Sequence, residues 1–347
     1  MRAMRFALFL ALAIVAEATI SGCGGNGSSG PVVNQANVYG VPQEGFVDGP
    51  VAKAEFGNPA KVEVGPDGSV YVADYDNNAI RVISPNGIVG TVVKQANFVQ
   101  PFGLTFSKDG FLYVSTDWND QGTKDDTSGT LWQVDVKNKT ATVVQRNLGR
   151  PRGLRAISST QIAMADLFHD TISIIDTTTK VVTVIAGAAD QTGHVNASGS
   201  AARFNGPYGM TQLPDGSLLV VDCNNNCIRR VTLAGEVSDY AGSTSAGLKN
   251  GPAATATFLN PEDVAYSNGN AYVADTGNHV IRRIGSGTVS TEAGNGKAGF
   301  VVAPGTSAEF YGLEGIAILP GSRTLWIADG NEGDGSNHNH VRKITVP

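Results

Sequence analysis

The stretch FLNPEDVAYSNGNAYVADTGNHVIRRI, residues 258–284, decides the fold of this protein, because the chain repeats it. The same pattern returns as FGNPAKVEVGPDGSVYVADYDNNAIRVI from Phe56 and as FNGPYGMTQLPDGSLLVVDCNNNCIRRV from Phe204. Weaker copies begin at Phe98, Leu148 and Phe310, so six copies cover residues 56–347. The residues that end the YVAD-like segment recur at spacings of 42, 50, 56, 53 and 54: Asp74, Thr116, Asp166, Asp222, Asp275 and Asp329. A period of about fifty residues is typical of a propeller blade.

Each copy divides into four short strands, which we name a to d in chain order. In the fifth copy they are predicted at residues 261–267, 271–275, 279–284 and 287–294. Asp-Gly pairs such as Asp67-Gly68 and Asp215-Gly216 stand between strands a and b, where a tight hairpin needs positive φ. Helical periodicity is absent from the sequence after residue 22. The chain is therefore predicted to be all-β, with one six-bladed propeller over residues 32–347.

The repeat unit also resembles a known family. Its Pro-x-Gly start, DG hairpin, YVAD strand and the step Asn278-His279-Val280-Ile281-Arg282 are similar to the NHL repeat. The resemblance implies a six-bladed β-propeller of NHL repeats.

The sequence predicts how the ring closes. The sixth unit ends at Pro347 after its strand c, whereas residues 32–41 precede the first unit. Linkers from the last Gly of strand d to the next Phe span 17, 16 and 16 residues: Gly187 to Phe204, Gly242 to Phe258, and Gly294 to Phe310. Gly40 to Phe56 spans 16. Residues 32–41 are thus predicted to be strand d of the last blade, pairing with residues 341–346 and removing an open sheet edge.

Residues 1–22 are predicted to be a signal peptide, because MRAMR is basic and FALFLALAIVA is an apolar run of signal length. The junction ISGC, ending at Cys23, resembles a bacterial lipobox. The resemblance implies a lipid on Cys23, and residues 23–31 would form a flexible tether. We expect an exported, lipid-anchored protein, at the outer membrane and facing the periplasm or the cell surface. An ordinary secretory signal that leaves Cys23 free is the alternative.

Composition limits the partners. The net charge is -6, charged residues make up 16% and apolar residues 41% of the chain. A mildly acidic surface does not attract phosphate backbones, so we expect no nucleic-acid partner. The membrane is expected to be contacted only through the lipid, and the protein to be a monomer.

Several repeated polar residues are assigned structural roles. The Asp that ends strand b recurs in five units, so it is expected to accept backbone N–H bonds at the b–c turn. The Arg of strand c, as in Arg81 and Arg282, is expected to be buried against carboxylates or carbonyls. Cys223 and Cys227 flank the b–c turn of the fourth unit in an exported protein, and a disulfide between them is predicted.

The candidate site is the second residue of strand a, which varies from blade to blade and should point to the channel mouth. Around the ring it is Ala60, Phe102, Arg152, Tyr208, Glu262 and Glu314. The predicted ligand-binding residues are Phe102, Arg152, Tyr208, Glu262 and Glu314. Glu262 and Glu314 would repel one another unless a divalent cation such as calcium, a basic ligand or Arg152 offsets them. A solvated channel rim is the alternative.

A second acidic cluster stands in the b–c loop of blade two, with Asp117, Asp120, Asp125 and Asp126. It lacks the EF-hand order, and a solvated surface loop is favoured over a calcium site there.

Two classes of function remain. The favoured one is a membrane-anchored, extracytoplasmic binding or scaffold propeller that recognises a protein, peptide or glycan at the channel mouth. The alternative is a metal-dependent hydrolase or lyase acting on a small lactone or glycan, similar to gluconolactonase-like propellers. Glu314-Gly315 resembles their strand-a Glu-Gly, but Phe102, Arg152 and Tyr208 stand where that family has Asn ligands. No catalytic residue is assigned, and binding is favoured over catalysis.

Overall fold

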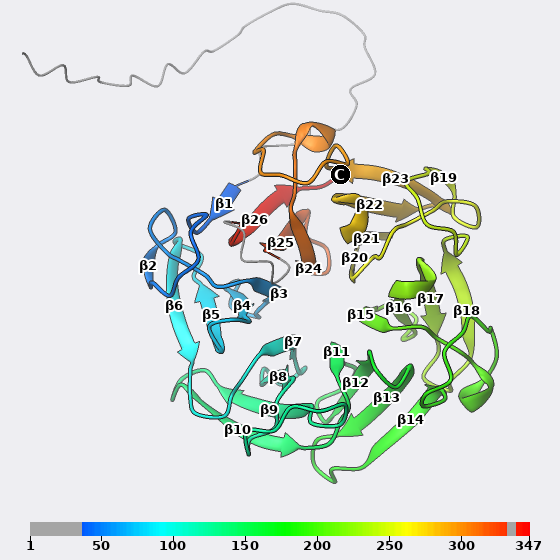
Figure 1. Ribbon diagram of the computed structural model, residues 1–347, viewed down its shortest axis with the longest axis horizontal. Helices are drawn as coiled ribbons and strands as arrows, with labels where there is room; N and C mark the ends of the chain where they lie inside the picture. The colour runs from blue at the N-terminus through cyan, green and yellow to red at the C-terminus, as the bar shows by residue number, and fades with distance from the viewer. Residues whose placement is uncertain (1–36, 332–337) are drawn as a thin grey trace, which may run out of the picture. The chain divides into compact units, whose positions relative to one another are not determined.

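The computed structural model describes residues 37–331 and 338–347. The predicted signal peptide, the tether with Cys23 and residues 32–36 lie outside the described residues. The described part forms six antiparallel sheets, of which five are built from strands that follow one another in the chain and the sixth joins β1 to β24, β25 and β26. Figure 1 shows the sheets as a ring, with the first strand of each blade nearest the centre. The prediction of an all-β, six-bladed propeller is confirmed.

The first three blades hold the following strands. Blade one holds β2 (Gly49–Pro50), β3 (Pro59–Val64), β4 (Val70–Asp74), β5 (Ala79–Ile83) and β6 (Ile88–Val93). Blade two holds β7 (Pro101–Phe106), β8 (Leu112–Thr116), β9 (Thr130–Asp135) and β10 (Thr140–Gln145). Blade three holds β11 (Pro151–Ala156), β12 (Gln161–Asp166), β13 (Thr171–Asp176) and β14 (Val182–Gly187).

The remaining strands complete the ring. Blade four holds β15 (Pro207–Gln212), β16 (Leu218–Asp222), β17 (Cys227–Val231) and β18 (Val237–Ala241). Blade five holds β19 (Gly251–Pro252), β20 (Asp263–Ser267), β21 (Asn270–Asp275), β22 (Val280–Gly285) and β23 (Thr288–Ala293). Blade six holds β24 (Gly312–Ile318), β25 (Thr324–Gly330), β26 (His340–Thr345) and β1 (Asn37–Tyr39).

Helical structure in the described residues is confined to short turns. These are the 3-10 turns η1 (Gly199–Ala201), η2 (Cys223–Asn225), η3 (Thr276–Asn278) and η4 (Gly305–Ser307). Within residues 37–331 and 338–347, no helix has the length and apolar character needed to cross a membrane.

The N-terminal strand closes the last blade, as predicted. β1 pairs antiparallel with β26, with Asn37, Val38 and Tyr39 opposite Lys343, Arg342 and Val341. The first strand of the described chain thus covers the outer edge of the last blade. The pairing joins the two ends of the ring and leaves less open sheet edge.

Four of the six blades are held by a buried ion pair between strands b and c. In blade five, Arg282 donates to Asp275 at 2.7 Å, and both side chains are fully buried. Asp275 also accepts from the Leu259 amide at 2.8 Å and from Asn278 at 2.9 Å. The same carboxylate–guanidinium pair recurs in three other blades: Asp74–Arg81, Asp222–Arg229 and Asp329–Arg342. The burial expected for the Arg against a carboxylate is confirmed. The Asp accepts backbone N–H bonds as expected, but in these four blades the donor lies in the segment before strand a instead of the b–c turn.

The second residue of strand a is displaced from the ladder. In blade three, Pro151 pairs with Asp166 and Gly153 with Ala165, so Arg152 occupies a bulge. Ala60 and Glu314 are displaced in the same way in blades one and six. A bulge re-aims its side chain, and this local geometry directs the variable residues.

Glycine at the third position of strand a lets the innermost strands of neighbouring blades approach one another. A Cβ on Gly153 would stand 2.3 Å from the Tyr208 carbonyl oxygen, and one on Gly209 would stand 2.1 Å from the Asp263 carboxylate. These contacts leave no room for a side chain, so the glycines bring neighbouring blades together near the axis.

Side chains fill the central channel at these glycine positions and beyond them, on the side away from the mouth. Blades one and five carry Lys61 and Asp263 at the position of these glycines, and the two form a buried ion pair at 2.5 Å. Glu63 of blade one and Arg155 of blade three lie 3.7 Å apart at the next level. Only about 20 Å³ of space remains among the channel-lining strands there. The channel is therefore a filled core with a mouth rather than an open pore.

The predicted disulfide between Cys223 and Cys227 is wrong for this structure, in which both cysteines are free and buried. Cys223 packs with Leu219 and Val221 toward blade five. Cys227 lies two residues from Arg229, whose guanidinium covers Phe204 on the other face of the sheet. Side chains on opposite faces cannot meet the geometry of a disulfide, although they are close in sequence.

Candidate functional site

The variable residues of blades two, three and four meet at the channel mouth. The rings of Phe102 (β7) and Tyr208 (β15) are 5.5 Å apart at 80°, although blade three separates their strands in sequence. Arg152 (β11) packs against both, with its guanidinium carbon 4.0 Å from the Phe102 ring centre and 5.9 Å from that of Tyr208. Three of the five predicted ligand-binding residues are therefore in one cluster, which we call the mouth cluster.

A third ring and a carboxylate complete the mouth cluster. Tyr75, which follows β4, packs edge-on against Phe102 at 6.2 Å. Its hydroxyl donates to Asp117 at 2.8 Å, and Asp117 also accepts from Arg152 at 3.1 Å. Arg152 is thus surrounded by three aromatic rings and one carboxylate, an arrangement that stabilises a cation strongly.

Burial of the mouth cluster alters its ionisation. Burial alone would lower the pKa of Arg152, but Tyr208, Asp117 and Tyr75 outweigh it and raise that pKa. Burial raises the pKa of Tyr208 well above its usual range, and Glu262 raises it further. Arg152 is therefore a permanent cation and Tyr208 a neutral hydroxyl at neutral pH.

Glu262 and Glu314 lie on the other side of the mouth. Glu262 immediately precedes β20 and is half-buried, and Glu314 (β24) is buried. Both carboxylates act electrostatically on Tyr208, which raises the pKa of its hydroxyl. The ion pair that the structure gives Arg152 is with Asp117. Ala60, the sixth member of the predicted ring, is small and fully buried.

The mouth cluster opens to solvent through a cavity between blades two and three. This cavity of about 300 Å³ is lined by Asp117, Lys124, Asp125, Asp126, Arg150 and Phe168. Arg150 donates to Asp117 at 2.8 Å, and its guanidinium carbon lies 4.8 Å from the Phe168 ring centre. Phe168 is 41% exposed, so one aromatic ring of the site is open to a partner. We call this space the mouth cavity.

Sequence reasoning missed Tyr75, Lys124, Arg150 and Phe168. A usable signal existed for Tyr75, because the residue after the Asp of strand b also differs in every blade: Tyr75, Asp117, Leu167, Cys223, Thr276 and Gly330. Arg150 stands in the segment Arg150-Pro151-Arg152, and no other unit has Arg on both sides of its strand-a Pro. Lys124 and Phe168 lie in b–c loops, whose position relative to the mouth depends on the loop path.

The structure gives no support to a metal site at the acidic residues. Asp120 pairs with Arg146 at 2.5 Å, and Asp125 accepts from the Thr127 amide at 2.8 Å, so the loop carboxylates point to separate partners. Among the described residues, no three His, Cys, Asp or Glu side chains converge as metal ligands would.

Comparison with known proteins agrees with the geometry. The family model described as NHL repeat matches residues 56–83 and 258–284. This chain is a six-bladed β-propeller of NHL repeats. The human NHL repeat-containing protein 2 is 33% identical over 137 residues, a match that spans 36% of this chain and 19% of that protein. The matched part is thus a minor share of the human protein.

Solved structures share the fold of this NHL propeller at low identity. An auxiliary nutrient binding protein from Bacteroides ovatus has a TM-score of 0.70 at 19% identity, covering 90% of this chain and 76% of its own. Another from Bacteroides thetaiotaomicron has a TM-score of 0.68 at 17% identity, covering 90% and 76%. Virginiamycin B lyase from Staphylococcus aureus has a TM-score of 0.53 at 17% identity, covering 82% and 80%. At these identities the likeness concerns the fold alone.

Proposed function

We propose that this NHL propeller is an exported, lipid-anchored binding protein whose ligand docks at the channel mouth. The observation that carries the proposal is the mouth cluster together with the mouth cavity. There the variable position of blades two, three and four brings a buried cation against aromatic rings, next to an exposed ring. Structural needs are alike in all blades and predict sameness at this position, whereas recognition predicts difference.

The charges at the mouth favour one kind of ligand. Arg150, Arg152 and Lys124 lie on the side of blades two and three together with Asp117, Asp125 and Asp126, and Glu262 and Glu314 belong to blades five and six. A partner carrying both charges, such as an extended peptide or a protein loop, fits this rim of mixed charge better than a neutral glycan. Two solved relatives in fold are named auxiliary nutrient binding proteins, which agrees with a binding role for this fold.

The experiment is a binding screen followed by paired variants. The Cys23→Ser protein is tested on peptide and glycan arrays, and hits are measured by calorimetry. Arg150→Ala and Phe168→Ala should each weaken binding about tenfold, because they remove the exposed cation and ring of the mouth cavity. Phe111→Ala, which removes an exposed ring on blade two at the opposite face, is the matched control.

Two outcomes would contradict the proposal. One is a ligand whose affinity is the same in wild type, Arg150→Ala and Phe168→Ala. The other is turnover of a sugar lactone by protein that metal analysis shows to hold a divalent ion lost in Glu314→Gln. That result would favour the hydrolase or lyase alternative.

A further inference from the structure

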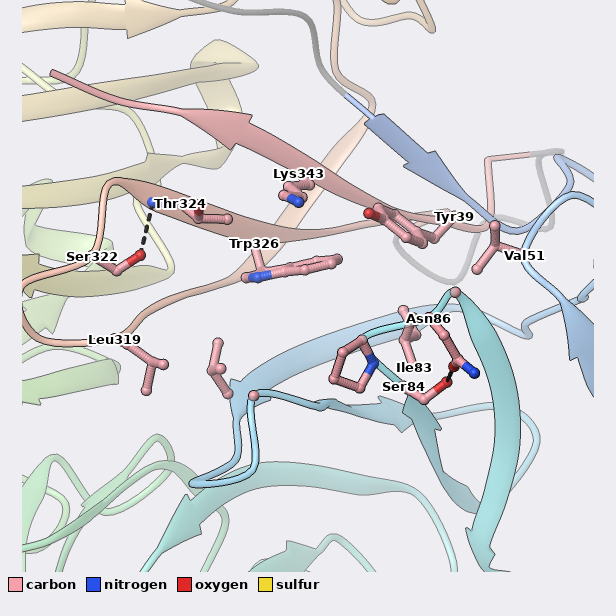
Figure 2. Close-up of a pocket in the computed structure, with 14 residues that line it drawn as sticks. Tyr39, Val51, Ile83, Ser84, Asn86, Leu319, Ser322, Thr324, Trp326 and Lys343 are labelled. Atoms are coloured by element: carbon pink, nitrogen blue, oxygen red, sulfur yellow. Dashed lines mark hydrogen bonds between the residues drawn. The ribbon is translucent and has the colours of Figure 1, made fainter.

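A second cavity lies between blades six and one, away from the mouth. It has a volume of about 570 Å³, within the range of small-molecule sites. Figure 2 shows Trp326 (β25), Lys343 (β26) and Tyr39 (β1) on one side of it, and Ile83 (β5) with Ser84 and Asn86 of the β5–β6 turn on the other. Because the a–b and c–d turns border it, the cavity belongs to the face opposite the mouth. We call it the seam cavity.

The seam cavity lies beside a repeat position that is less buried in blade six than in the other blades. In the other blades the strand-b position of Trp326 is occupied by Tyr71, Tyr113, Ala163, Leu219 and Tyr272, which are 5%, 4%, 0%, 0% and 1% exposed. Tyr71 is covered by Phe106 of the next blade, at 4.9 Å between ring centres. In blade one, the strand-a position that corresponds to Phe106 is occupied by the much smaller Val64, which lies in the same core cluster as Trp326. The large indole therefore faces space where other blades have core, and it is only half-buried.

The walls of the seam cavity combine flat apolar surface with a polar edge. The rings of Trp326 and Tyr39 are 4.9 Å apart at 49°, so together they form a bent aromatic wall. Ser84, Asn86, Ser322 and Thr324 supply hydroxyl and amide groups around it. Ser84 donates to Asn86, and the Thr324 amide donates to Ser322 at 3.0 Å, which holds these groups in place. A ligand with an apolar ring face and many hydroxyls would match both features, because its ring face would cover the indole while its hydroxyls bond to these polar groups.

The charge of the seam cavity is positive. Lys343 is its one charged lining residue, and its Nζ lies 5.5 Å from the Trp326 ring centre. Within the residues that the structure describes, Lys343 forms no ion pair with a carboxylate. An acidic group on the ligand would complete this site at little cost, because the ammonium is half-exposed already.

We propose that the seam cavity binds a hexuronic acid, as a free sugar or as a residue of an acidic glycan. The C–H face of the sugar ring lies on Trp326 beside Tyr39, its hydroxyls bond to Asn86, Ser322 and Thr324, and its carboxylate meets Lys343. This is a second binding site, independent of the mouth and of the proposed function there.

The test uses glucuronic and galacturonic acid as probes, measured by calorimetry on the Cys23→Ser protein. Lys343→Gln should weaken binding of both acids about tenfold and leave any binding of glucose or galactose unchanged, because only the carboxylate is affected. Trp326→Leu, which places the residue of blade four at this position, should abolish stacking and weaken acid and neutral sugars alike. Lys108→Gln and Phe111→Ala are the matched controls for lost charge and lost ring.

Melting temperatures separate binding from folding, since Trp326 also contacts the core. Lys343→Gln removes a surface charge and is expected to keep the wild-type melting temperature. Arg150→Ala at the mouth should bind uronic acids as wild type does. The experiment can therefore contradict the seam-cavity proposal without contradicting the proposed function at the mouth, and the reverse. The proposal is overturned if neither acid binds at millimolar concentration, if Lys343→Gln binds both acids as wild type does, or if an aromatic acid such as indole-3-acetate binds and the uronic acids do not.

Discussion

His340, the first residue of β26, shows how burial alters one side chain. It is 1% exposed and its ring stacks on Phe300 at 4.2 Å and 15°. Burial lowers the pKa of His340, and repulsion from Arg342 and His338 adds to this effect, so that the pKa falls to about 4. The folded protein therefore holds this imidazole neutral throughout the physiological range.

This histidine should make the fold sensitive to acid. A pKa lower in the folded than in the unfolded state means that the unfolded chain binds the proton first, so stability is complete above about pH 6.5 and falls as the pH approaches 4. His340→Val, which copies Val280 of blade five, should lose this contribution, worth up to about 3 kcal/mol. Urea unfolding of both proteins at several pH values between 7.5 and 4.5 measures it. Parallel pH profiles for wild type and variant would contradict the assignment.

At the scale of elements, the blades join strands b and c through different polar contacts. Four blades join strands b and c with a buried Asp–Arg pair, but blade two has Thr116 and Trp132 instead, with the indole N–H donating to the hydroxyl at 2.8 Å. A neutral hydrogen bond costs less desolvation than an ion pair, and it is also less costly to break.

This difference predicts unequal effects of matching substitutions. Arg282→Met should lower the free energy of unfolding by about 3–5 kcal/mol, because Asp275 stays buried without its cation. Trp132→Phe in blade two should lower it by about 1–2 kcal/mol, because only a neutral bond is lost. Denaturant unfolding of both variants gives the comparison, and equal losses would show that the ion pair holds no special place in the blade.

The closing strand is the element on which the ring depends. Deleting residues 32–41 should lower the free energy of unfolding by several kcal/mol, because β26 loses its outer partner and an edge is exposed. Deletion of residues 24–30 is the control of similar length. If both deletions leave the same melting temperature, the N-terminal strand does not hold the ring together.

At the scale of the whole molecule, the proposed lipid anchor would hold the propeller at a membrane surface. Cys23→Ser should move the protein from the detergent phase to the aqueous phase in a detergent partition, because the acyl chains supply most of the membrane affinity. Metabolic labelling with a fatty acid should mark wild type and not the variant. Wild type that takes up no label would contradict the lipid anchor and leave an ordinary secretory signal.

The sequence by itself determined the fold of the described residues, the number of blades and the way the ring closes. These follow from local patterns, such as the DG turns, the repeated Asp and Arg, and the 16-residue linkers, because each blade repeats the same short-range chemistry. It also pointed to Phe102, Arg152 and Tyr208, because a position that varies within a strict repeat is visible in one chain.

Only the tertiary structure decided which side chains meet. Tyr75 and Arg150 reach the mouth cluster through contacts between blades that are far apart in sequence, and the packing of neighbouring blades sets those distances. Cys223 and Cys227 are neighbours in sequence, yet the pleat of the sheet sends them to opposite faces. The seam cavity depends on Val64 meeting Trp326 across the closure of the ring, a contact that no local pattern encodes.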